Sequence, residues 1–208
     1  WRDHRSGNYD IYAQRIDSDG NIHAGWQAAG EPICTEGHDQ GSPQIISDGS
    51  GGAIIAWEDT RDGAFDIYAQ RIDPDGSIHA GWQTDGEPIC TYTGYQYGVR
   101  MIFDGSGGAI ITWMDNRTGD YDIYAQRIDA DGNIHTGWAA EGEPICTFAE
   151  DQNGNHIISD SSGGAIIAWR DSRDGNNDIY AQRINADGNI HEGWAVDGVP
   201  VCTETSSQ

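Results

Sequence analysis

The sequence predicts an all-β fold built from one repeated unit, and the spacing of its tryptophans and cysteines is the main reason. All eight tryptophans fall at two positions of a 56-residue period: Trp1, Trp57, Trp113 and Trp169 at one, Trp26, Trp82, Trp138 and Trp194 at the other. The cysteines keep the same period, at Cys34, Cys90, Cys146 and Cys202. No segment shows the 3.6-residue apolar period of an amphipathic helix. A fixed period of this length indicates an array of structural repeats.

Each repeat contains four strand-like runs separated by turn residues. In the unit that follows residue 41 the runs are 43–47, 53–57, 66–72 and 88–91. The glycine-rich segment 48–52 and the acidic turn 73–76 between them are typical of hairpins. A longer connection that contains Trp82 leads to the last run. The order predicts a four-stranded antiparallel meander.

The pattern of apolar residues places these strands in a larger architecture. Run 53–57 is apolar on both faces, so it must lie between two packed sheets. Run 66–72 alternates Ile67, Ala69 and Arg71 with Tyr68, Gln70 and Ile72, which favours a more peripheral strand. A repeated meander with a doubly buried central strand describes the blades of a β-propeller.

The repeat boundaries predict three complete blades and one partial blade in a single propeller segment, 1–208. The complete blades span approximately 41–96, 97–152 and 153–208. The partial blade, 1–40, lacks its first strand and most of its second, which correspond to residues 41–56 of the next copy. Open ends expose apolar faces and strand edges. We therefore expect completion by flanking sequence or by association with another copy of the chain.

Several runs resemble a known repeat type. The segments Pro-Gln-Ile-Ile-Ser-Asp-Gly at 43–49, Asp-Ile-Tyr-Ala-Gln-Arg-Ile-Asp at 66–73 and Asp-Pro-Asp-Gly at 73–76 recur along the chain. They resemble the blades of sialidase-like, Asp-box propellers, and more closely a repeat of bacterial secreted and cell-surface proteins. The resemblance implies a propeller fold and an extracellular or cell-surface location, and it assigns no activity.

Charge and hydropathy exclude several classes of partner. The chain has 34 acidic and 11 basic residues, all of them arginine, for a formal charge of −23. Such a surface repels DNA, RNA and anionic lipid, so nucleic-acid binding is excluded as a main function. The longest apolar runs are much shorter than the roughly 20 residues that cross a bilayer, so membrane insertion is not expected.

The acidic turns between the third and fourth strands are candidate calcium sites. Clustered carboxylates suit a hard cation, but each turn supplies only two side chains. Aspartate and glycine also stabilise the turn itself, which is the favoured interpretation. No other cofactor is indicated. The candidate ligands are Asp17, Asp19, Asp73, Asp75, Asp129, Asp131 and Asp187.

The loop between the second and third strands is the first candidate ligand site. It repeats an Asp-x-Arg-x-Gly-x-x-Asp pattern, as in Asp59, Arg61 and Asp66, and an arginine bracketed by two aspartates can staple the loop. The residue before the second aspartate is Tyr9, Phe65, Tyr121 or Asn177. An exposed aromatic ring beside carboxylates can stack on a sugar and bind its hydroxyl groups. Glycan binding is therefore the more specific hypothesis for this loop, beside the stapling role.

The linkers between repeats vary most and should lie at the same end of each blade as these loops. The second linker region gathers Tyr92, Tyr95, Tyr97 and Arg100, where a ligand is expected unless these residues pack against a neighbour. The shared glutamines are expected to tie each linker to the next blade: Gln40, Gln96, Gln152 and Gln208.

The repeated histidines and cysteines are expected to be structural. His23, His79, His135 and His191 lie in equivalent loops that a propeller distributes around a ring, so they should pack near the second tryptophan rather than share a metal. The cysteines lie on separate blades, beyond the roughly 7 Å between Cα atoms that a disulfide tolerates. We expect free thiols on the fourth strands.

Three functions follow in order of preference. The first is a non-catalytic binding or adhesion module for a carbohydrate or another surface polymer. The second is a structural module that forms a ring or fibre by completing blades between chains. A glycosidase comes third, since carboxylate pairs are abundant. The chain lacks the Gly-x-Ser-x-Gly, phosphate-loop and His-Glu-x-x-His motifs, so an enzyme is not expected.

Overall fold

Four antiparallel sheets make up the computed structural model, which describes residues 1–204. The first sheet has three strands: β1 (Arg2–Asp3), β2 (Asp10–Ala13) and β3 (Glu31–Cys34). The second contains β4 (Gln40–Ser47), β5 (Ala53–Asp59), β6 (Asp66–Ile72) and β7 (Glu87–Cys90). The third contains β8 (Gln96–Phe103), β9 (Ala109–Asp115), β10 (Asp122–Ile128) and β11 (Glu143–Cys146). The fourth contains β12 (Gln152–Ser159), β13 (Ala165–Asp171), β14 (Asp178–Ile184) and β15 (Val199–Cys202).

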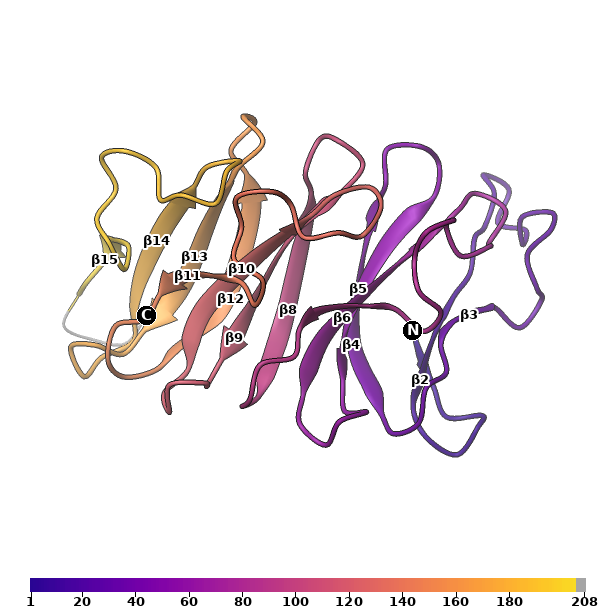
Figure 1. Ribbon diagram of the computed structural model, residues 1–208, viewed down its shortest axis with the longest axis horizontal. Helices are drawn as coiled ribbons and strands as arrows, with labels where there is room; N and C mark the ends of the chain where they lie inside the picture. Colours follow the sequence, from indigo (N-terminus) through magenta and orange to yellow (C-terminus); the bar gives the residue numbers. More distant parts are fainter. Residues whose placement is uncertain (205–208) are drawn as a thin grey trace.

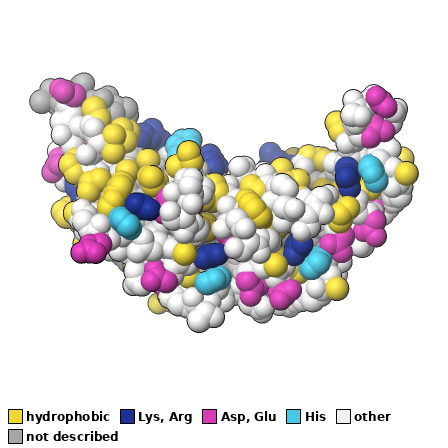
Figure 2. Space-filling model, turned by 90° about the horizontal axis from the view of Figure 1, so that it is seen from above, with side chains coloured by type: hydrophobic (Ala, Val, Ile, Leu, Met, Phe, Trp, Pro, Cys, Tyr) yellow, Lys and Arg dark blue, Asp and Glu magenta, His cyan; other side chains and the backbone are white. Residues whose placement is uncertain are grey.

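Each complete sheet is a meander in which sequential strands are neighbours, as in the blade of a propeller. The four blades stand in sequence order along the long axis of the molecule (Figure 1). The first strands of successive complete blades, β4, β8 and β12, lie next to one another. The row of blades therefore curves, and Figure 2 shows the molecule as an arc that is hollowed on one side. The predicted fold, three complete blades and one partial blade, is confirmed.

The core lies between consecutive blades rather than inside any one of them. Ile54 and Ala56 of the second blade pack against Ile111 and Trp113 of the third. On the opposite face of the second blade, Trp57 packs against the first blade. The prediction that the second strand is buried on both faces is therefore confirmed. Within residues 1–204 no helix has the length and apolar character needed to cross a membrane.

The prediction of a peripheral third strand is wrong, because β6 is buried along its whole length. Its polar side chains have buried partners. Arg71 Nη2 lies 2.9 Å from Asp48 Oδ2, and Gln70 Nε2 donates to the Gln83 carbonyl at 2.6 Å. Polar residues can occupy a protein interior when each is hydrogen-bonded. Alternation in the sequence does not reveal those partners.

The first tryptophan of each repeat lies on a glycine of its own blade. Trp57 is fully buried and stacks on Tyr68, with 6.4 Å between the ring centroids. A Cβ atom on Gly86 would lie 2.5 Å from the Trp57 ring, and Gly86 has a φ of 100°. The same contact recurs in every blade: Gly30 with Trp1, Gly142 with Trp113, and Gly198 with Trp169.

The second tryptophan of each of the first three repeats joins one blade to the next. Trp82 Nε1 and Arg71 Nη1 both donate to the Ala130 carbonyl of the third blade, at 3.1 and 2.8 Å. The equivalent arginine and tryptophan of the first blade donate to the carbonyl of Pro74 in the second blade. Those of the third blade donate to the carbonyl of Ala186 in the fourth. The acidic turn between the third and fourth strands is therefore the acceptor of an inter-blade contact.

We predict that Gly86→Ala destabilises the chain by about 3 kcal/mol, because the new methyl group meets a packed indole ring. Gly63→Ala is the matched control: Gly63 also has a positive φ, of 93°, but an added Cβ meets nothing within 4 Å. That variant should lose only about 1 kcal/mol of unfolding free energy, which is the cost of a side chain at a positive φ. Urea unfolding followed by tryptophan fluorescence measures both. Equal losses in the two variants would contradict the packing role of Gly86.

Candidate functional site

One end of the blades carries the loops between second and third strands together with the linkers between repeats, and we call it the loop rim. It comprises loops 60–65 and 116–121 with linkers 35–39, 91–95 and 147–151. Loop and linker are hydrogen-bonded, as when Gln96 N donates to the Phe65 carbonyl at 2.7 Å. Tyr95 N donates to Asn116 Oδ1 of the next blade at 2.6 Å. The predicted proximity of loops and linkers is confirmed.

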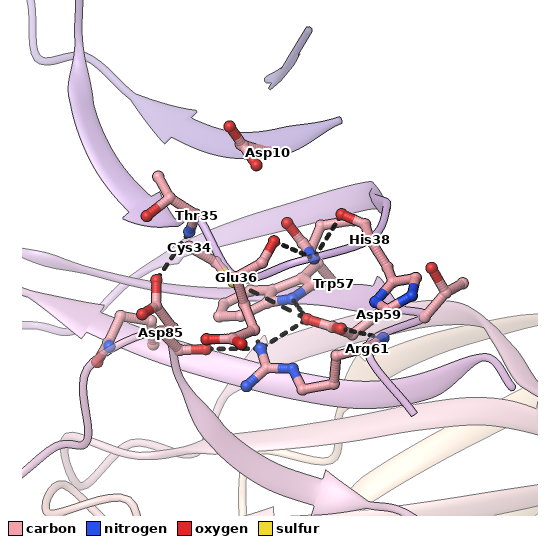
Figure 3. A network of polar contacts seen from close by, with 12 residues as sticks. Asp10, Cys34, Thr35, Glu36, His38, Trp57, Asp59, Arg61 and Asp85 are labelled. Carbon is pink, nitrogen blue, oxygen red and sulfur yellow. Dashed lines mark hydrogen bonds and ion pairs between the residues drawn. The ribbon is translucent and has the colours of Figure 1, made fainter. Parts of the chain in front are cut away.

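Beneath the loop rim a buried polar network connects neighbouring blades (Figure 3). Asp59 Oδ2 accepts hydrogen bonds from Trp57 Nε1 at 2.8 Å and from Arg61 Nη2 at 2.6 Å. Arg61 Nη2 also donates to the Asp85 carbonyl at 2.8 Å, and Asp85 Oδ1 accepts the Thr35 amide of the first blade at 2.7 Å. The network recurs around Asp115 with Arg117 and around Asp171 with Arg173.

This network confirms that the loop arginine staples the loop, but the expected bracket of two aspartates is wrong. Among residues 1–204, the acidic partner of Arg61 is Asp59. Asp66 begins β6 and does not pair with Arg61. The guanidinium instead stacks on Tyr68, 3.8 Å from the ring centroid. Arg61 therefore donates to Asp59 and Asp85 of its own blade, and its Nη2 also donates to Cys34 Sγ of the preceding blade at 3.4 Å.

The cysteines beside the network are neutral structural thiols. Cys34, Cys90 and Cys146 are free and buried on separate blades, as predicted. Burial raises the pKa of each of these three thiols to about 12. The thiolate is the reactive form of cysteine, so these side chains are protected from chemistry at neutral pH.

Four of the predicted ligand residues form two aromatic pairs at the loop rim, which together we call the aromatic row. Phe65 and Tyr95 lie 6.3 Å apart between ring centroids, and Tyr97 and Tyr121 lie 5.0 Å apart in an edge-to-face arrangement. Phe65 and Tyr95 are 40% and 48% exposed. Burial, followed by the hydrogen bond with Tyr121, raises the pKa of Tyr97, and the charges of Asp151 and Glu58 add to the effect. Carboxylates therefore lie beside the aromatic row.

The other predicted ligand residues lie outside this row. Tyr9 is at the first junction between blades, under the guanidinium of Arg2. Arg117 covers Tyr92 at 4.5 Å from the ring centroid. Arg100 lies on β8 and donates to the Val99 carbonyl at 2.8 Å. Asn177 Oδ1 accepts the Ser172 hydroxyl at 3.0 Å.

Sequence reasoning missed one exposed aromatic residue. Phe148 is 44% exposed and lies under Arg173, with 4.4 Å from the guanidinium carbon to the ring centroid. It occupies the position of Tyr92 in the next repeat, 56 residues on. A position-by-position alignment of the linkers would have identified it.

The repeated glutamines hold the linker in a different way from the one predicted. Gln40 Nε2 donates to the carbonyls of Glu36 and His38 in its own linker, at 3.3 and 3.2 Å. The contact with the neighbouring blade is made by the main chain, because Gln40 N donates to the Tyr9 carbonyl at 2.7 Å. Gln152 repeats both contacts. Gln208 lies outside the described residues.

The acidic turns show the hydrogen bonding of a turn. Asp17 Oδ1 accepts the amides of Asp19 and Asn21, both at 2.9 Å, and Asp129 does the same in the third blade. In the second blade Asp73 Oδ1 lies 2.6 Å from His79 Nδ1. Across residues 1–204, no group of three or more His, Cys, Asp or Glu side chains is placed to hold a metal ion. Calcium binding at these turns stays a prediction.

The repeated histidines bond within their own turns rather than to a shared ligand. His191 Nδ1 lies 2.7 Å from Asn185 Oδ1, and the rings of His23 and His135 each contact the carbonyl of the following residue at 3.0 Å. The His79 carbonyl accepts the amide of Trp82 at 3.1 Å. These contacts support a structural role, and packing of the imidazole rings on the second tryptophan stays a prediction.

Two aspartates, each at the start of the third strand of its blade, have raised pKa values. Burial, reinforced by the charges of Asp62 and Asp59, raises the pKa of Asp66 to about 6. Burial likewise raises the pKa of Asp122 to about 6, although the hydroxyl of Thr118 donates to its carboxylate. Both carboxyl groups change protonation near neutral pH.

Comparison with known proteins gives structural similarity at low sequence identity. No protein-family model and no curated protein matches the chain. A TolB-like protein from Agrobacterium tumefaciens matches with 18% identity and a TM-score of 0.47, over 91% of this chain and 58% of that one. An endo-arabinase from Bacteroides thetaiotaomicron matches with 14% identity and a TM-score of 0.48, over 97% of this chain and 75% of that one. The chain spans less than two thirds of the TolB-like protein.

We predict that Asp66→Asn stabilises the chain at pH 7.5 by on the order of 2 kcal/mol and has little effect at pH 4. The folded-state pKa is raised, so the native chain holds this proton more tightly than the unfolded chain. Stability from this group is therefore present at low pH and falls as pH rises from about 4 to about 6. Urea unfolding across this range measures the effect, with Asp19→Asn as an exposed control. A gain that does not change with pH would contradict the assignment.

Proposed function

We propose that the chain is a non-catalytic binding module of Asp-box-type propeller repeats in an extracellular or cell-surface protein. Its ligand is a carbohydrate or another surface polymer, bound along the loop rim. The observation that carries this proposal is the aromatic row of Phe65, Tyr95, Tyr97 and Tyr121, which crosses from the second blade to the third.

The chemistry of the row supports a sugar ligand. Tyrosine and phenylalanine offer a flat apolar surface at little cost in side-chain entropy. Asp151 accepts the amide of Tyr121 at 3.0 Å, which places a carboxylate where sugar hydroxyl groups can donate. The net charge of −23 disfavours acidic polymers. A neutral polysaccharide therefore fits the loop rim best.

The carboxylates below the row support binding without hydrolysis. A glycosidase needs one carboxyl group to give up a proton and another to attack or activate water. Asp59 and Asp115 are fully buried and held in ion pairs with Arg61 and Arg117. Their hydrogen bonds hold the loops in place, so we assign them a scaffold role.

The test is an array of neutral and acidic glycans, followed by calorimetry on the strongest neutral hit. Tyr95→Ala and Phe65→Ala should each weaken binding by roughly tenfold, since each removes one stacking surface. Phe148→Ala is the matched control, because it removes an equally exposed aromatic residue outside the row. Reducing-end release should stay at the level without protein. An array with no neutral hit, or equal losses in all three variants, would overturn the proposal.

Assembly through the end blades is a second candidate function, favoured by the exposure of core positions there. Val201 is 63% exposed, whereas Ile145 at the same repeat position is 1% exposed. At the other end Ile16 is 65% exposed, whereas its equivalent Ile72 is 2% exposed. These faces are the two opposite halves of the contact between consecutive blades. A second copy could therefore stack head to tail on either end.

Size-exclusion chromatography with light scattering tests the assembly. We expect a mass that rises with concentration, and Val201→Asp should return the chain to a monomer by placing a charge in the contact. Val196→Asp is the control, because Val196 is 79% exposed on a loop away from the sheet. A monodisperse monomer at every concentration would remove this second function.

A further inference from the structure

The three junctions between consecutive blades share one contact, in which two donors of a blade hold the acidic turn of the next. In the second blade Arg71 Nη1 and Trp82 Nε1 donate to the Ala130 carbonyl at 2.8 and 3.1 Å, and the carbonyls of Pro74 and Ala186 are held in the same way. We call this contact the turn grip. Its donors lie on the third strand and in the connection after it. The first blade therefore carries the equivalent groups although its sheet has three strands.

A glycine of each held turn packs on the tryptophan of the same grip. The three pairs are Gly76 with Trp26, Gly132 with Trp82 and Gly188 with Trp138, and an added Cβ atom would lie 3.2, 3.1 and 3.4 Å from the ring. Each pair joins residues of two consecutive blades. The turn therefore fits closely against the preceding blade, with little room for a side chain at the glycine position.

The fourth blade has both donors of the grip, and within residues 1–204 neither holds a turn. Arg183 pairs with Asp160 at 2.8 Å, and its Nη1 atom lies 3.3 Å from His191 Nε2 of its own blade. Trp194 is half-buried at the position of Trp82, and no acceptor among the described residues reaches its Nε1 atom. Arg183, Asp160 and His191 line an open pocket of about 500 Å³. The donor half of the grip is therefore in place at this end.

The first blade has the acceptor half. Ser18 stands at the position of Ala130, and the Asp17 carbonyl accepts the Gly20 amide at 3.1 Å, the same turn hydrogen bond as in the third blade. Gly20 has a φ of 81°, close to the 83° of its equivalent in the third blade. Among the described residues no donor reaches the Ser18 carbonyl, and an added Cβ atom on Gly20 would meet nothing within 4 Å. The turn has its usual form without a blade against it.

We propose that a second copy of this chain supplies the missing half at each end, so that Arg183 and Trp194 of one copy hold the Ser18 carbonyl of the next. The inference rests on the assembly function above and specifies its contact. One end offers donors and the other offers an acceptor, so the ends are complementary rather than alike. Copies therefore join head to tail, with the fourth blade of one against the first blade of the next.

Apolar side chains at both ends agree with this pairing. Ile22 in the first blade is 43% exposed, whereas its equivalent Ile78 packs against the core between blades. Ile158 in the fourth blade is 64% exposed, whereas its equivalent Ile102 packs against such a core. A contact like the three internal ones would cover both residues and remove water from the grip. Burial of this apolar surface would supply most of the association free energy.

The experiment uses the 208-residue chain in size-exclusion chromatography with light scattering. Moderate salt screens the repulsion between copies that each have a net charge of −23. Gly20→Asn should weaken association at least roughly tenfold, because the new side chain occupies the place of the tryptophan of the other copy. Asparagine tolerates the positive φ of this position, so the single chain should stay folded.

Gly175→Asn is the matched control. Gly175 has the same φ of 81° as Gly20, and an added Cβ atom there also meets nothing within 4 Å. Its equivalents in the other three blades meet nothing either, so this side chain stays clear of every junction. The variant should associate as the unaltered chain does. Trp194→Phe tests the donor, because it keeps an aromatic ring and removes Nε1, and it should weaken association roughly fivefold.

A mixing experiment tests the direction of the contact. Gly20→Asn blocks the first-blade end and Val201→Asp blocks the fourth-blade end, so each variant alone should be a monomer. In an equal mixture the intact fourth blade of one variant can hold the intact first blade of the other. We expect dimers and nothing larger. A mixture that stays monomeric would overturn the head-to-tail contact.

The outcomes also separate this inference from the assembly function on which it rests. If the unaltered chain associates, and Gly20→Asn and Trp194→Phe associate equally well, the turn grip between copies is wrong and assembly uses another contact. If the unaltered chain is a monomer at every concentration, both the grip between copies and the assembly function are overturned.

Discussion

The fold depends on one carbonyl group in the acidic turn of each of the last three blades, which accepts hydrogen bonds from two donors of the preceding blade. In the second blade these donors are Arg71 and Trp82, and the acceptor is the carbonyl of Ala130. Arg71 also pairs with Asp48, whose other oxygen accepts the amides of Ser50 and Gly52. One arginine thus links a hairpin, the strand β6 and the next blade. Loss of Asp48 would leave the charge of Arg71 buried and unpaired, which typically costs several kcal/mol.

The architecture was predictable because every repeat packs against its neighbours through the same residue positions. Two tryptophan positions at a fixed period are enough to indicate stacked units, and the alternation in 53–57 locates the strand that is covered on both sides. The failures concern residues whose partners lie in another part of the fold. Arg71 and Gln70 suggested an exposed strand, yet Arg71 bonds to a carbonyl 59 residues away and Gln70 to one 13 residues away. A pattern with a period of two residues contains no information about such partners.

The candidate site was predictable only in part, and for a related reason. Tyr95 and Tyr97 were identified because the varied linkers stand out against a constant frame, and both belong to the aromatic row. Arg100 is near them in sequence, but the chain has by then entered β8, where its guanidinium bonds to the main chain. Tyr92 is 46% exposed, but it lies outside the aromatic row with the guanidinium of Arg117 over its ring. Closeness in sequence therefore gave the right region, whereas membership of the aromatic row depended on which ring of a neighbouring loop each tyrosine contacts.

The same constancy explains how one chain can hold different chemistry at equivalent junctions. The stapling networks and turn contacts fix the main chain of each loop, so a change of side chain leaves the frame intact. At the position of Asn8 the later repeats carry Ala64, Asp120 and Asn176. Each choice sets whether the loop carries an amide, an apolar methyl group or a carboxylate at that junction. Because Tyr121 follows Asp120 directly and belongs to the aromatic row, a change of side chain on this loop alters the proposed ligand surface and leaves the main chain in place.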